Sequence, residues 1–156
     1  MKPQKLLVLV IGHLIGALLL TSCQDSSQGK QPSQEVIDTF LEFVEAYKNL
    51  ESRKALSFFS TEDGFMMLQT HQLSGTEIND YFISSMQQTS TFDSVSFSNT
   101  KVQMLSDQIA VLRCNFFEQY TLKSGESQRF NGAGLYVFKK FSNQWKIVHS
   151  AGAVAN

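Results

Sequence analysis

The sequence predicts an α+β domain in which helices come first and antiparallel strands follow. Apolar residues recur at helical spacing between residues 33 and 90, and the period changes to two after residue 90. Turn sequences then separate long strand-like segments that are consecutive in the chain. This order is typical of helices packed on one face of a curved sheet. With 42% hydrophobic residues, the 156-residue chain can bury one core and suits one domain.

Residues 1–22 have the features of a secretory signal. Lys2 and Lys5 give a positive start, and the apolar run after them is shorter than the roughly 20 residues of a membrane-spanning helix. Leu-Thr-Ser-Cys at residues 20–23 resembles a bacterial lipobox, which implies cleavage before Cys23 and attachment of lipid to it. The alternatives are a short membrane-spanning anchor, or an ordinary signal followed by an incidental cysteine.

The lipobox resemblance implies a lipoprotein of the bacterial envelope. The protein is then attached to the membrane, its expected partner, through lipidated Cys23, and the domain faces the periplasm or the cell surface. Gln24, where inner-membrane lipoproteins carry Asp, favours the outer membrane over the inner one. Residues 23–32 are polar and predict a flexible tether, which leaves residues 33–156 as the domain. Cys114 is the only other cysteine and is expected to be a small buried hydrophobe.

Two helices are expected at the start of the domain. Ser33 follows Pro32 and is expected to cap the first, with Glu35 in its first turn. The residues on its apolar face are Val36, Phe40, Phe43, Val44 and Tyr47. Residues 52–59 predict a second, shorter helix, and residues 61–64 predict a turn.

A strand and a third helix follow. Residues 65–68 form a short apolar run that predicts a buried strand, and His71 is expected on a loop. Ser74 and Glu77 have the spacing of a capping box. The helix that follows carries its apolar face at Ile78, Tyr81, Phe82 and Met86.

The second half of the domain predicts four strands. The apolar parity changes between residues 97 and 102, which predicts a bulge near Asn99. Long strands are expected over residues 109–122 and 127–140, with a hairpin turn at 123–126. Gly132 and Gly134 permit a bend. The final strand covers residues 145–150 after a turn at 141–144.

Three sequence features resemble one known superfamily. They are Asn-Gln-Trp-Lys-Ile-Val-His-Ser at residues 143–150, Gly75 before a helix, and Asp-Gln-Ile-Ala-Val at 107–111. Over residues 33–152 the chain resembles nuclear-transport-factor-two-like domains, and among them SnoaL-like domains. The resemblance implies a cone: a curved antiparallel sheet around the N-terminal helices, with a central cavity. It also implies a homodimer paired through the sheet.

The superfamily includes ketosteroid isomerase, dehydratases, cyclases and non-catalytic binding domains, so the fold alone does not give a function. Isomerase-type members use an Asp base with a Tyr and a protonated Asp. The matching positions fall near Leu68, near Phe40 or Leu41, and near Tyr136, and residues 64–79 contain no Asp. We therefore expect no catalytic residue of that type.

Five residues are candidates for the lining of the cavity: Tyr47, Tyr81, Arg113, Tyr136 and His149. His149 shares strand parity with Trp145 and Ile147, so it is expected to face inward, as a general base, a metal ligand or a histidine satisfied by a neighbour. Arg113 either reaches solvent, pairs with an acid such as Glu118, or meets an anionic ligand. Tyr120 and Asn131 are further polar candidates.

These observations favour non-catalytic binding of a small apolar or amphipathic ligand, or of a protein partner. The alternatives are an isomerase, dehydratase or hydrolase that uses His149 for proton transfer, and a dimerisation module. No metal-ligand spacing and no phosphate-binding glycine loop occurs, so no metal and no cofactor are expected. With 13 Lys and Arg against 14 Asp and Glu and no basic run, nucleic acid is not an expected partner.

Overall fold

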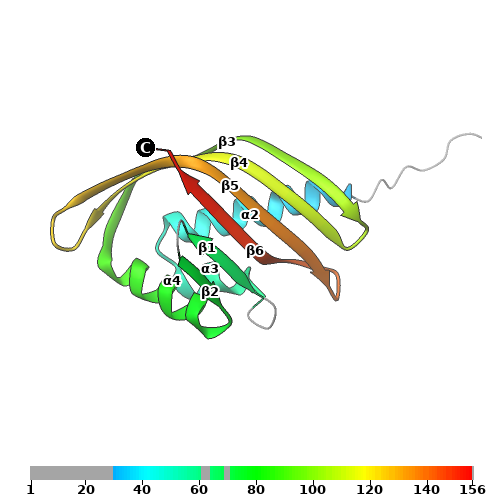
Figure 1. The fold of residues 1–156 in the computed structure, drawn as a ribbon, viewed down its shortest axis with the longest axis horizontal. Coiled ribbons are helices and arrows are strands. Elements are labelled where there is room, and N and C mark those ends of the chain that lie inside the picture. The colour runs from blue at the N-terminus through cyan, green and yellow to red at the C-terminus, as the bar shows by residue number, and fades with distance from the viewer. Residues whose placement is uncertain (1–29, 61–63, 69–70, 156) are drawn as a thin grey trace, which may run out of the picture.

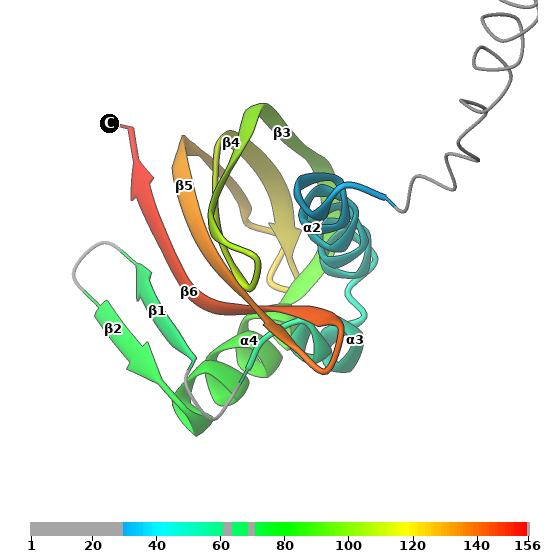
Figure 2. The same cartoon turned by 90° about the vertical axis from the view of Figure 1, so that its right-hand side faces the viewer.

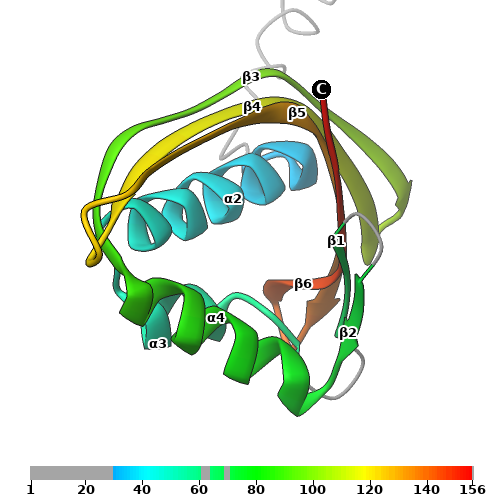
Figure 3. The same ribbon diagram turned by 60° about the vertical axis from the view of Figure 1, so that its left-hand side comes forward.

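The computed structural model describes residues 30–60, 64–68 and 71–155. Four long strands, β3 (Thr89–Ser106), β4 (Ile109–Leu122), β5 (Ser127–Phe141) and β6 (Gln144–Val154), form a strongly curved antiparallel sheet (Figure 1). Helix α2 (Pro32–Lys48) lies in its concave side, and helices α3 (Ser52–Ser57) and α4 (Thr76–Gln88) face α2 across the interior (Figure 3). The predicted α+β cone with N-terminal helices is confirmed. The predicted signal peptide of residues 1–22 and Cys23 lie outside the described residues.

Helix α2 (Pro32–Lys48) begins at proline and has Gln31 as its N-cap, without a side-chain hydrogen bond. The expected cap at Ser33 is wrong, because Pro32 takes the first helical position, where its fixed φ and missing N–H cost nothing. The predicted apolar face is confirmed, and its buried residues are Val36, Phe40, Phe43, Val44 and Ala46.

Helix α3 (Ser52–Ser57) ends earlier than expected, and Phe59 beyond it forms an isolated bridge with Ile147. Helix α4 (Thr76–Gln88) buries Ile78, Phe82 and Met86. Its N-cap is Gly75 rather than Ser74, and Glu77 accepts a hydrogen bond from the backbone N–H of Ser74 at 3.1 Å. Half of the predicted capping box is therefore present. Within the described residues, no helix combines the length and the apolar character needed to cross a bilayer.

The six strands lie in the order β2-β1-β6-β5-β4-β3. Strand β1 (Phe65–Leu68) matches the prediction, whereas β2 (His71–Ser74) was not predicted and begins at His71, which was expected on a loop. The two form a hairpin that joins the sheet through a parallel pairing of β1 with β6 (Figure 2). This parallel pairing was not predicted, since it joins segments that are far apart in the sequence.

The long strands follow the sequence pattern closely. Strand β3 (Thr89–Ser106) shifts register between Ser98 and Lys101, and Asn99 there has a φ of 52°, which confirms the predicted bulge. Strand β4 (Ile109–Leu122) has the predicted bounds, and β5 (Ser127–Phe141) extends one residue further than expected.

Strand β6 (Gln144–Val154) continues past its expected end at Ser150. Its last residues pair with Gly132, Ala133, Gly134 and Leu135 of β5. A Cβ on Gly132 would lie 2.0 Å from the carbonyl oxygen of Ala153. Glycine is therefore needed there for the close approach of the two strands.

A second bulge lies in β6. Val137 pairs with His149 and Phe138 with Ile147, so Val148 is the extra residue. Ile147 and Val148 are both buried, and the inward parity changes from odd to even after them. The expected inward orientation of His149 is wrong, because one inserted residue moves every later side chain to the opposite face.

Glu35 joins helix α2 to the β5–β6 turn. Its Oε2 accepts hydrogen bonds from Lys140 Nζ at 2.8 Å and Trp145 Nε1 at 3.0 Å. The hydrogen bonds from Lys140 and then Trp145 hold the pKa of the Glu35 carboxyl below its ordinary value. This contact is stabilising only while the carboxyl is ionised.

The stabilisation from Glu35 is expected to depend on pH. Because its folded-state pKa is depressed, the contribution is complete above the unfolded-state value of about 4.3 and is lost as pH falls through the folded-state pKa. Urea unfolding of wild type and of Glu35→Gln should therefore differ at neutral pH and converge in acid. Glu42→Gln, on the exposed side of α2, is the matched control. A wild-type advantage that stays constant down to about pH 3 would contradict this role.

Candidate functional site

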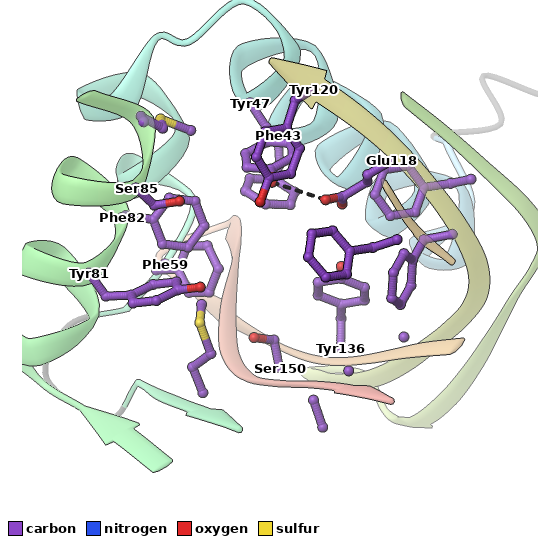
Figure 4. A pocket seen from close by; sticks show the side chains of 18 of the residues that line it. Phe43, Tyr47, Phe59, Tyr81, Phe82, Ser85, Glu118, Tyr120, Tyr136 and Ser150 are labelled. Carbon is purple, nitrogen blue, oxygen red and sulfur yellow. Dashed lines mark hydrogen bonds between the residues drawn. The ribbon is translucent and has the colours of Figure 1, made fainter. Parts of the chain in front are cut away.

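A cavity of about 610 Å³ lies between the sheet, α2 and α4. Half of the residues on its wall are aromatic: Phe43, Tyr47, Phe59, Tyr81, Phe82, Phe92, Phe97, Phe116, Tyr120, Phe130 and Tyr136. Figure 4 shows side chains from both helices and from the sheet pointing into this space. The cavity that the family resemblance implied is therefore present, and its wall is largely apolar.

Strand β4 supplies the acidic group of the cavity. Its even-numbered side chains face inward, first into the core at Ala110, Leu112 and Cys114 and then into the cavity at Phe116, Glu118 and Tyr120. Glu118 is thus on the wall because of strand parity. Sequence reasoning considered it only as a partner for Arg113 and missed this role, because apolar residues on both faces of the strand obscured the alternation.

Glu118 and Tyr47 form the polar centre of the site. Tyr47 Oη, on α2, donates a hydrogen bond to Glu118 Oε2 at 3.2 Å (Figure 4). Burial raises the pKa of the Glu118 carboxyl, and the hydrogen bond from Tyr47 opposes this shift. Burial, and then the charge of Glu118, raise the pKa of the Tyr47 phenol well above its ordinary value.

The other phenols on the wall also keep their protons. Burial raises the pKa of Tyr81, Tyr120 and Tyr136, and the charge of Glu118 adds to each shift. The site therefore combines a carboxyl that can accept a hydrogen bond or a proton with neutral phenols that can donate hydrogen bonds.

Three of the five predicted lining residues, Tyr47, Tyr81 and Tyr136, lie on this wall, and so does Tyr120. Arg113 and His149 do not: both side chains are exposed, on odd-numbered positions that face away from the cavity. Asn131 is also exposed. Arg113 pairs in register with Lys101 and Leu135, so it does not lie beside Glu118.

Cys114 carries a potentially reactive group outside the polar centre. Cys114 is buried, as predicted, and burial raises the pKa of its thiol to about 11, which keeps it protonated and unreactive near neutral pH. Among residues 30–60, 64–68 and 71–155, no group of three His, Cys, Asp or Glu side chains is arranged to hold a metal ion.

Solved structures with the same fold come from several bacteria. A candidate aromatic ring hydroxylase from Novosphingobium aromaticivorans aligns with a TM-score of 0.73 and 16% identity, over 80% of this chain and 90% of that one. A nuclear-transport-factor-two-like superfamily protein from Salmonella enterica serovar Typhimurium aligns with a TM-score of 0.72 and 14% identity, over 80% and 92%.

A ketosteroid isomerase-like protein from Erwinia carotovora aligns with a TM-score of 0.70 and 14% identity, over 82% of this chain and 99% of that one. At these identities the similarity establishes the fold and not the activity. No curated protein matches the chain.

Comparison of the sequence with models of protein families gives a match to one type of domain. The model of the SnoaL-like domain matches residues 36–156, which is most of the chain and includes every residue on the cavity wall. Together with the cone fold, this match shows that the chain belongs to the SnoaL-like domain family.

Proposed function

We propose that this domain binds a small, largely apolar molecule in its cavity and holds one hydrogen-bonding group of that molecule against Glu118 and Tyr47. The observation that carries the proposal is an aromatic cavity of about 610 Å³ with the Glu118–Tyr47 carboxyl–phenol pair on its wall. Ligand sites are commonly cavities of roughly 300–1,000 Å³ with apolar walls and a few placed polar groups.

The hydrogen bonding of Glu118 supports this proposal. An ionised carboxylate has two acceptor oxygens, and the hydrogen bond from Tyr47 reaches one of them. An enclosed carboxylate that lacks further donors is costly, so a donor on a bound molecule would gain more here than in water. The apolar part of the ligand would gain about 25 cal/mol for each Å² that it buries against the rings.

Filling the cavity from Gly152 is expected to abolish binding. Gly152 lies on the wall, and a Cβ added there would meet no atom within 4 Å, so leucine can enter the open space without backbone strain. Fluorescence titration with aminoanthracene, a neutral amphipathic probe, should give a Kd for wild type and at least a tenfold weaker one for Gly152→Leu.

Ala153→Leu is the matched control, because it adds similar bulk to an exposed residue next along the strand. It should leave the affinity for aminoanthracene unchanged. Equal binding by wild type and Gly152→Leu, or no binding by either, would contradict the proposed function. Native mass spectrometry of the purified domain would then identify any ligand that it retains.

The Glu118–Tyr47 pair also favours a second candidate, an enzyme that transfers protons. A carboxyl with a raised pKa in an apolar site is suited to accept a proton from a substrate, and neutral phenols can stabilise the negative charge that develops. His149, which the sequence suggested for this role, is exposed, so Glu118 is the proton-transfer group of this candidate function. Exchange of carbon-bound hydrogen of a retained ligand for solvent deuterium, lost in Glu118→Gln, would distinguish turnover from binding.

The assembly alternative has less support. A module that serves only for dimerisation needs no internal cavity, whereas this domain has one of about 610 Å³. The homodimer stays a prediction. Leu135 and Ile109, which are 42% and 38% exposed on the outer face of the sheet, supply apolar surface for it.

We further propose that the domain is a lipoprotein of the bacterial envelope, held to the outer membrane through lipidated Cys23. The proposal is supported by the signal-like residues 1–22 and by the polar tether that precedes the domain. The ligand site would then lie in the periplasm or at the cell surface.

A further inference from the structure

The described part of the cavity wall carries a negatively charged side chain and no positively charged one. Glu118 is the charged residue on the wall, and no Lys, Arg or His lies beside it among the residues that the structure describes. Burial raises the pKa of its carboxyl, and the hydrogen bond from Tyr47 opposes this shift. The carboxyl therefore faces the cavity without a basic partner on its wall.

Aromatic rings surround this carboxyl. Tyr47, Phe92, Tyr120 and Phe130 form a continuous series of rings, whose successive centroids are 4.7, 5.5 and 6.0 Å apart. Phe130 pairs in register with Glu118, and Tyr120 lies two residues after Glu118 on the same inward face. The series, called here the ring arc, begins at the residue that donates to Glu118 Oε2.

We propose that the ligand of this cavity is an organic cation: a small molecule with an apolar body and an ammonium group that binds between Glu118 and the ring arc. This inference rests on the proposed binding function and names the chemical class of the ligand. A carboxylate supplies the counter-charge, and the negative faces of aromatic rings attract a cation within about 6 Å of their centroids.

The other ligand charges fit the site less well. An anionic headgroup would meet Glu118 as a like charge, with no basic side chain on the described wall to offset the repulsion. A neutral alcohol would supply one hydrogen bond to Glu118 and no attraction to the ring faces. An ammonium group supplies a charge-assisted hydrogen bond and the interaction with the rings together.

The pH dependence separates these classes further. Glu118 must be ionised to hold an ammonium group. The affinity of the domain for an ammonium ligand should therefore fall as pH decreases through the raised pKa of Glu118. The titratable groups that face Glu118 are Tyr47 on α2, Tyr81 on α4, Tyr120 on β4 and Tyr136 on β5. All four are phenols with raised pKa values, so they stay neutral over the same range.

The test uses three probes that share a phenylalkyl body: phenylbutylammonium, phenylbutanol and phenylbutyrate. Isothermal titration calorimetry of the purified domain should show the ammonium binding about ten times more tightly than the alcohol, and the carboxylate most weakly. Lowering the pH from about 8 to 4 should weaken binding of the ammonium much more than binding of the alcohol, which loses only the charge assistance of one hydrogen bond.

Variants test which side chains hold the ammonium group. Glu118→Gln keeps the shape of the side chain and should weaken binding of the ammonium about tenfold, with a much smaller effect on the alcohol, which can still donate to the amide oxygen. Phe130→Leu keeps apolar bulk, removes one ring of the arc, and should weaken binding of the ammonium about threefold. Glu42→Gln removes the same charge from the exposed side of α2. It should change neither the binding of the ammonium nor that of the alcohol.

The outcomes also separate this inference from the proposed function. An alcohol that binds as tightly as the ammonium, or a carboxylate that binds most tightly, would overturn the inference and leave the cavity-binding function standing. Absence of binding by all three probes would overturn both. If Glu118→Gln fails to fold, Phe130→Leu and the pH profile of wild type still decide the question.

Discussion

Replacing Phe40 with alanine is expected to lower the free energy of unfolding by about 3–5 kcal/mol. Phe40 is 1% exposed and is one of the largest fully buried side chains. Its ring lies edge-on to Phe97 with centroids 5.2 Å apart, and 4.9 Å from the ring of Tyr136. The substitution removes these contacts and leaves a void between α2 and the sheet, which the rigid strands cannot fill.

The loss would be a large part of the stability of a domain this size, for which about 5–15 kcal/mol is typical. Urea unfolding can be followed by the fluorescence of Trp145, the only tryptophan in the chain and a buried one. Leu41→Ala is the matched control, because Leu41 is the next residue on α2 and is 55% exposed; we expect a change within about 0.5 kcal/mol. A loss below about 1 kcal/mol for Phe40→Ala would show that this core packs differently.

Replacing Cys23 with serine is expected to remove the protein from the membrane fraction of cells. If two or three acyl chains are attached to Cys23, each buried methylene contributes about 0.8 kcal/mol, so the anchor is effectively permanent and its loss is nearly complete. Serine keeps the size of the side chain and removes the thiol that the lipid requires. Metabolic labelling with an alkyne fatty acid should label the wild type and not Cys23→Ser.

Cys114→Ala provides the control for this experiment. Cys114 is the only other cysteine and is buried on strand β4, so its removal should affect neither labelling nor fractionation. Labelling of Cys23→Ser, or its unchanged recovery with membranes, would contradict the lipoprotein proposal and favour a membrane-spanning leader.

Most of the secondary structure could be predicted because local periodicity reports which side of each element is buried. The apolar face of α2 and the bounds of β4 follow directly from residue spacing. The bulge at Asn99 was also visible, since asparagine adopts positive φ more readily than most residues and the apolar parity changes beside it. Strand β2 and the end of β6 were missed, because Gln72, Gly152 and their neighbours carry little strand propensity of their own.

The candidate site could be predicted only in part. Tyr47 was identified because it lies on the apolar face of the first helix, and Tyr136 because it falls near a position that isomerase-type relatives use in their site. His149 was misplaced because the bulge at Val148 is set by pairing with β5, and nothing in residues 145–150 marks it. Glu118 was missed because its environment comes from helix α2, which precedes it by 71 residues at Tyr47.

The sequence by itself determined the order of helices and strands and the apolar faces that build the core. Those features depend on spacing within a few residues, which the chain carries locally. Only the tertiary structure decided which strands pair in parallel, which way His149 faces, and that one carboxyl and a phenol meet inside an aromatic cavity. Those features depend on register and on contacts between distant segments, and the packing of the whole domain sets both.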